Sequence, residues 1–95
     1  MNKEVVSGKA PSAIGPYSQA VLTSGNTIYV SGQLPINPST GEFPSDDIHA
    51  QTRQSLENVK AVLEASGFGM NDVAKTTVLL ADIDDFGAMN EVYSE

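Results

Sequence analysis

One long amphipathic stretch constrains the fold more than any other part of the chain, and it predicts a helix over residues 46–66. Ser45, Asp46 and Asp47 offer caps for its N-terminus, and Gly67 fits the position just beyond its last turn. The side chains of one helical face recur at three- and four-residue steps: Ile48, Thr52, Leu56, Val59 and Leu63, with Val62 beside them. Runs of β formers flank this helix, so the predicted fold class is α+β.

Two β runs precede the helix. Residues 7–16 predict an ordered loop or extended arm, and residues 17–22 and 27–34 then predict a hairpin around a Gly-Asn turn. Gly32 interrupts the second run and marks a bulge or a close backbone approach. Residues 35–42, with two prolines, predict a loop.

Another β run, residues 73–80, follows the helix directly and predicts a β–α–β crossover with parallel flanking strands. Asp82 then caps a second helix, which carries Phe86, Asn90 and Tyr93 on one face. The sequence stops at Glu95 inside this helix, without a closing glycine or a basic last turn. We therefore expect a longer natural chain, of which this piece lacks the C-terminal strands.

Composition excludes several classes of function. There is no cysteine, which excludes disulfides, thiolate metal sites and cysteine nucleophiles, and the one histidine, His49, is too few for an imidazole metal site. We therefore expect no metal site. Ninety-five residues allow a single domain, residues 1–95, with a marginal core, so oligomerisation is the expected source of further buried area.

Charge and hydropathy bear on partners and location. A net charge of -7 repels phosphate backbones and argues against a nucleic-acid partner. No apolar run approaches the length of a membrane span, and the N-terminus lacks the features of a signal peptide, so the expected location is cytoplasmic, away from membranes.

A few side chains stand out as polar or aromatic groups on otherwise apolar elements. Each also has an ordinary structural explanation, such as covering a hydrophobic edge or facing solvent, and spacing alone does not decide between the two. The candidate site residues are Tyr17, Ser31, Gly32, Phe86, Asn90 and Tyr93.

Five motifs, in order along the chain, carry a resemblance to a known family. They are Ala13-Ile14-Gly15-Pro16-Tyr17-Ser18-Gln19-Ala20, Val30-Ser31-Gly32-Gln33-Leu34-Pro35, the segment from Gln51 to Lys60, the segment from Asp72 to Val78, and Asp85-Phe86-Gly87-Ala88-Met89-Asn90. The chain closely resembles the RidA (YjgF/YER057c/UK114) family of reactive intermediate deaminases.

The resemblance implies a chorismate mutase-like fold, with a mixed sheet and two helices packed on one face. It also implies a homotrimer with a central barrel-like core and clefts between subunits. The implied reaction is hydrolysis of enamines and imines, such as 2-aminoacrylate and 2-aminocrotonate, to 2-keto acids and ammonia without a cofactor. An electrophilic imine carbon needs only a held carboxylate and a placed water.

The family's catalytic arginine and late glutamate lie in a segment expected beyond Glu95, and Arg53, in the first helix, does not match that arginine. Tyr17, Ser31 and Gly32 match the substrate-facing segment of one subunit. Phe86 and Asn90, and more weakly Tyr93, match a wall given by the neighbouring subunit. Two alternatives stay open: a translation inhibitor with endoribonuclease activity, and a trimer that binds a small ligand without turnover.

Overall fold

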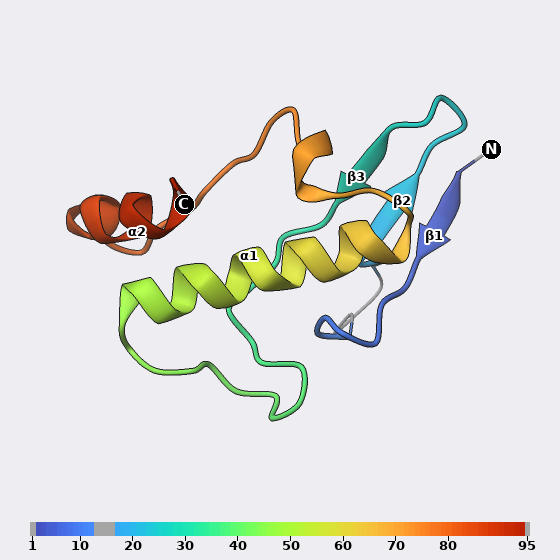
Figure 1. Ribbon diagram of the computed structural model, residues 1–95. Coiled ribbons are helices and arrows are strands. Elements are labelled where there is room, and N and C mark those ends of the chain that lie inside the picture. The colour runs from blue at the N-terminus through green and yellow to red at the C-terminus, as the bar shows by residue number, and fades with distance from the viewer. Residues whose placement is uncertain (1, 13–16, 95) are drawn as a thin grey trace.

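Three short strands form an antiparallel sheet in the computed structural model, which describes residues 2–12 and 17–94 (Figure 1). The strands are β1 (Lys3–Val5), β2 (Ala20–Leu22) and β3 (Ile28–Val30), in the order β1-β2-β3. Ala20 pairs with both Val5 and Val30, which fixes the register across the sheet. Two α-helices complete the architecture of the described residues, so the α+β prediction is confirmed.

The predicted hairpin is β2–β3, with shorter strands than the sequence indicates. The main-chain NH of Thr23 donates to the carbonyl of Thr27 at 2.8 Å and closes the turn. Asn26 adopts the left-handed conformation there, with φ 63°, which asparagine tolerates better than most residues. The NH of Ser31 donates to the carbonyl of Gln19 at 3.0 Å and extends the pairing one step beyond β3.

The long helix forms where its periodicity predicts it, as α1 (Ile48–Ala65). Asp47 is the N-cap, because its carboxylate accepts from the main-chain NH groups of His49 and Ala50. Gly67 has φ 85°, a conformation that a side chain would strain, and so ends the helix as expected. In the described part of the chain, no helix is long and apolar enough to cross a membrane.

The hydrophobic core lies between the sheet, the N-terminal arm and α1. Its buried members are Val5 from β1, Ala10 from the arm, Ala20 from β2 and Val62 from α1. Partly buried side chains complete this layer: Leu22, Ile28, Val30 and Ala61. A core this small explains why polar contacts, described below, hold much of the surrounding loop structure.

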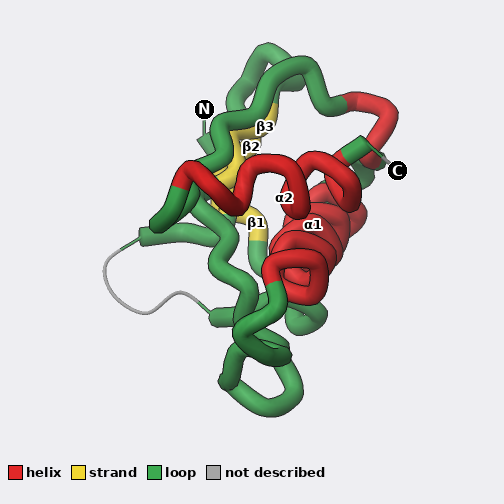
Figure 2. The backbone as a smooth tube through the Cα atoms, turned by 90° about the vertical axis from the view of Figure 1, so that its left-hand side faces the viewer, coloured by secondary structure: helices red, strands yellow, loops and turns green. Residues whose placement is uncertain are grey.

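The second helix, α2 (Phe86–Tyr93), follows the short 3-10 helix η2 (Ile83–Asp85), which Asp82 caps as predicted for this helix start. α2 packs mainly against α1, with Met89 and Val92 buried (Figure 2). The family resemblance implies two helices packed on one face of the sheet. Of the two, only α1 packs on the sheet in this way. α2 meets the sheet chiefly through α1.

The predicted third β run was wrong for the described structure. Residues 73–80 follow the 3-10 helix η1 (Met70–Asp72) and form no strand, and the described sheet contains no parallel pair and no β–α–β crossover. The segment has the composition of a strand, but a strand also needs a neighbouring backbone to receive its hydrogen bonds. Its side chains remain largely exposed, with Leu79 at 90%.

Candidate functional site

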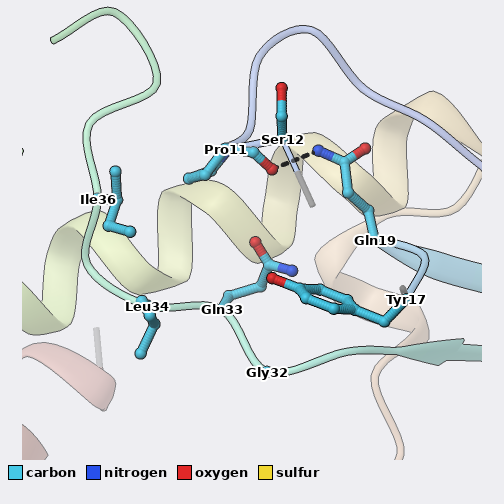
Figure 3. Close-up of a pocket in the computed structure, with 8 residues that line it drawn as sticks. All are labelled: Pro11, Ser12, Tyr17, Gln19, Gly32, Gln33, Leu34 and Ile36. Carbon is cyan, nitrogen blue, oxygen red and sulfur yellow. Dashed lines mark hydrogen bonds between the residues drawn. The ribbon is translucent and has the colours of Figure 1, made fainter. Parts of the chain in front are cut away.

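A shallow hollow opens where the N-terminal arm, the start of β2 and the segment after β3 meet (Figure 3). It contains two residues singled out in the sequence, Tyr17 and Gly32. Its volume is about 30 Å³, close to the share of one water molecule. The lining residues are Pro11, Ser12, Tyr17, Gln19, Gly32, Gln33, Leu34 and Ile36.

One wall of the hollow is held by the carboxamide of Gln19, which is only 5% exposed. Its Nε2 donates to the carbonyl of Pro11 at 2.6 Å and also lies 3.2 Å from the carbonyl of Ser7. Its Oε1 accepts from the NH of Ser7 at 2.6 Å. A buried amide with both ends satisfied fixes its partners strongly, because leaving any of them unpaired would be costly. Gln19 therefore fastens the arm to the strand that begins beside it.

The opposite wall is held by the carboxamide of Asn58, on the inner face of α1 and 1% exposed. Its Nδ2 donates to the carbonyls of Leu34 and Ile36, each at 2.9 Å. Its Oδ1 accepts from Nε2 of Gln54, one helical turn earlier, at 3.0 Å. The loop after β3 is therefore tied to α1 by one buried side chain.

The predicted site residue Ser31 lies beside the hollow and has a positioning contact. Its hydroxyl donates to the carbonyl of Ser18 at 2.6 Å, next to the main-chain bond from its NH to Gln19. These two bonds fix the backbone that follows Tyr17. Because the hydroxyl proton is used within the chain, Ser31 can offer a ligand only its acceptor lone pairs.

The lining offers polar groups without formal charge. Tyr17, Ser12 and Gln33 supply a phenol, a hydroxyl and a carboxamide, and Leu34 and Ile36 supply apolar surface. In Figure 3 the ring of Tyr17 points toward Gln33. Such a surface can contact a small planar polar ligand, but a bound carboxylate would need a positive charge from outside these eight residues.

The other three predicted site residues are on α2, and none of them lines this hollow. Phe86 is 53% exposed, Asn90 is exposed, and the hydroxyl of Tyr93 is hydrogen-bonded to that of Thr76. The structure thus brings Tyr17, Ser31 and Gly32 together and leaves the α2 residues on a separate exposed surface.

Several lining residues were missed in the sequence. The hydrogen bond from Gln19 to Pro11 holds Pro11 and Ser12 at the hollow. The hydrogen bonds from Asn58 hold Leu34 and Ile36 there. Both pairs therefore depend on contacts between distant segments. The sequence pattern gives no clear signal for these contacts, because Gln19 shares its predicted strand face with the exposed Tyr17 and Asn58 lies outside the apolar stripe of the helix. The motif residues 13–16 lie outside the described residues.

The single histidine lies away from the hollow and links the two helices. Nε2 of His49 lies 2.7 Å from a carboxylate oxygen of Glu91 on α2, and Nδ1 lies 3.2 Å from Asp47. The hydrogen bond with Glu91, followed by that with Asp47, raises the pKa of His49 above its ordinary value. The hydrogen bond with His49 lowers the pKa of the Asp47 carboxyl.

Two further features of the described residues bear on ligands. No group of three or more histidine, cysteine, aspartate or glutamate side chains is placed to hold a metal ion among them. A second, wider hollow of about 180 Å³ lies along α1, where Lys9 and Lys60 face Glu57 and Glu64. Its mixed charges, on a solvated helix face, single out no ligand.

The chain matches known proteins over nearly its whole length. The family model described as Endoribonuclease L-PSP matches residues 7–95. A RutC family protein of Pyrococcus horikoshii is 54% identical over 95 residues, covering 100% of this chain and 75% of the relative. The 2-iminobutanoate/2-iminopropanoate deaminase of Escherichia coli K12 is 52% identical over 93 residues, covering 98% of this chain and 71% of the relative.

The fold also matches solved structures. The crystal structure of E. coli TdcF with bound serine superposes with a TM-score of 0.90 at 46% sequence identity. The match covers 97% of this chain and 71% of that structure's chain. The strands, α1 and α2 described above are thus shared with a protein that has been seen holding a small amino acid.

Proposed function

Since this chain belongs to the RidA/YjgF family, we propose that it acts as a hydrolytic deaminase of reactive enamine and imine acids. The proposed substrates are 2-aminoacrylate and 2-aminocrotonate in their imine forms, 2-iminopropanoate and 2-iminobutanoate. The proposed products are the corresponding 2-keto acids and ammonia. The observation that carries this proposal is the match, over 98% of this chain, to a relative named for deamination of these two imines.

The chemistry asks little of the protein. Water adds its oxygen to the imine carbon and a proton to the nitrogen, giving a carbinolamine. The carbon–nitrogen bond then breaks, ammonia leaves, and the carbonyl of the keto acid forms. No electrons are transferred to or from an outside group, so orientation of the imine and of the water is the main requirement.

The hollow fits the role of one wall of such a site. Tyr17 and Gly32 face it, and Gln19 and Asn58 hold its two sides in place. At about 30 Å³ it is far below the several hundred Å³ of a typical ligand pocket, so a further wall is required.

We further propose that a neighbouring copy of this chain supplies that wall in a homotrimer with a barrel-like core. The exposed face of α2, with Phe86 and Asn90 and with Tyr93 at its end, is the proposed contribution of the neighbour. Exposed apolar side chains on residues 73–80, above all Leu79, add surface suited to association. Sedimentation equilibrium should then give three times the chain mass, and a strictly monomeric active protein would contradict the assembly.

A coupled assay tests the activity. A pyridoxal-phosphate dehydratase acting on serine generates 2-aminoacrylate, and pyruvate release is followed with and without this protein. We expect faster pyruvate release in its presence. If the protein binds the imine or keto acid but leaves the rate unchanged, the non-catalytic binding alternative replaces the deaminase.

The matching family description names an endoribonuclease, which keeps the RNA alternative open. The net charge of -7, with only five basic residues, weighs against RNA binding. Retention of labelled RNA at roughly 150 mM salt, a concentration at which phosphate contacts are partly screened, would favour that alternative.

A further inference from the structure

The side chain of Gln33 presents a hydrogen-bond acceptor to the hollow. Gln33 follows Gly32 in the segment after β3, and its Nε2 donates to the carbonyl of Ser31 at 3.3 Å. A carbonyl can only accept, so the amide end that faces Ser31 must be the NH₂ group. This contact fixes the orientation of the amide group, with Nε2 toward Ser31 and Oε1 toward the hollow.

Oε1 is also accessible. Among the residues that the structure describes, no group donates to it, and no buried side-chain nitrogen or oxygen there lacks a partner. An oxygen without a partner must therefore be reachable by solvent or by a ligand. Figure 3 shows the amide oxygen of Gln33 directed into the space between Tyr17 and the Pro11–Ser12 wall.

From this placement we infer that Gln33 is a specificity-determining residue that selects ligands carrying an N–H donor over ligands that carry only a carbonyl at the same carbon. The inference rests on the proposed function. The imine presents an N–H and the carbinolamine presents an amino group, whereas the keto acid product presents only a carbonyl oxygen. An acceptor at Oε1 therefore favours the substrate and the intermediate, because each can donate a hydrogen bond to it. The keto acid product has no donor at that position and gains no such bond.

The structure surrounding Gln33 supports this reading. Of the two lining carboxamides, that of Gln19 is fully used in holding the arm. The hydroxyl of Ser31 donates to Ser18 and lies outside the lining set. Gln33 is thus the lining carboxamide whose acceptor end is not committed to the fold.

The test compares two ligands of nearly equal size, serine with its N–H donors and pyruvate without any. Isothermal titration gives the dissociation constant of each for the wild type and for Gln33→Met, which keeps the side-chain length and removes the acceptor. We expect serine to bind about tenfold more weakly to the variant, while the pyruvate constant changes by less than about twofold. Gln51→Met on α1 is the matched control, since Gln51 does not line the hollow and its amide donates to the carbonyl of Ser45.

Three outcomes would overturn the inference: equal weakening of both ligands, no change in either, or no binding of either by the wild type. Equal weakening would show that Gln33 only shapes the hollow. Pyruvate release by the wild type is measured separately in the coupled assay, so failure of the inference and failure of the deaminase proposal give different results.

Discussion

The carboxamide of Asn58 donates to the carbonyl of Leu34 at 2.9 Å, which ties the inner face of α1 to the segment that follows β3. The same nitrogen serves Ile36, so one side chain satisfies two carbonyls of a loop without regular structure. This is the contact through which the longest helix of the chain shapes the candidate site.

Replacing Asn58 by leucine should therefore destabilise the protein more than the small change in side-chain size suggests. The loop carbonyls of Leu34 and Ile36 would lose their donor, and we expect a loss of ~1–3 kcal/mol in the free energy of unfolding, measured by urea denaturation. Gln51→Leu near the start of α1 is the control and should cost clearly less, because Gln51 is only partly buried. Equal losses in the free energy of unfolding for the two variants would show that the buried amide of Asn58 contributes no more to stability than the amide of Gln51.

Gln19→Glu tests the other wall. The change keeps the shape but replaces an NH₂ donor by a carboxylate oxygen, which would face the carbonyls of Ser7 and Pro11 as a like partner. We expect ~1–3 kcal/mol of lost stability at neutral pH, in urea denaturation followed by circular dichroism. Because protonation of the new carboxyl restores one donor, part of the loss should be recovered in acid. A pH-independent loss would contradict this account of the contact.

Tyr17→Ala tests the aromatic wall of the hollow through activity. Under the proposed function, loss of the ring should lower kcat/KM in the coupled assay about tenfold, equivalent to roughly 1.4 kcal/mol of transition-state stabilisation. Tyr29→Ala offers a matched control, because this tyrosine lies on β3, is 68% exposed and does not line the hollow. An equal loss of kcat/KM in both variants would show that Tyr17 has no specific role in the site.

The link between His49 and Glu91 predicts a pH dependence of stability. The bond to Glu91 raises the pKa of His49, so its contribution is complete below the unfolded-state pKa and is lost as pH rises through the higher folded-state pKa. Glu91→Gln should thus reduce stability near about pH 5.5 and have little effect near about pH 8.5, in paired urea titrations. Glu64→Gln, elsewhere on α1, should show no such difference between the two pH values.

The contribution of Asp47 to stability depends on pH in the opposite direction to that of His49. The pKa of Asp47 is lowered, so its contribution is present above the ordinary carboxyl range and is lost as pH falls through the depressed value. The two groups therefore act in separate windows, with Asp47 weakening in acid and His49 weakening above neutrality. A wild-type stability profile without the alkaline decrease would show that the His49–Glu91 contact does not form in solution.

The parts of the fold that depend on neighbouring residues could be predicted from the sequence. α1, its cap Asp47 and its terminating Gly67 follow from periodicity and local hydrogen bonding, and the β2–β3 turn follows from its Gly-Asn pair. The run at residues 73–80 could not be resolved in this way, because β propensity describes side chains and says nothing about whether a partner strand is present.

The candidate site shows the same division. Tyr17 and Gly32 were identified through the family motifs, and both line the hollow. Gln33 stands in the same motif as Gly32 but was not singled out, and its contact is local. The two wall-forming pairs were not identified, since their places depend on buried amides that join segments up to 24 residues apart. Sequence spacing does not encode such contacts, and the burial of the two amides becomes visible only in the structure.

The separate fastening of the two walls has a consequence for motion. Gln19 holds the arm from the strand side and Asn58 holds the loop from the helix side, and no bond between these two amides couples them among the described residues. We therefore expect each wall to open independently of the other. Amide hydrogen exchange should reveal this as two groups of protons with different opening free energies, one near Ser7 and one near Ile36, so that the hollow widens from either side in turn.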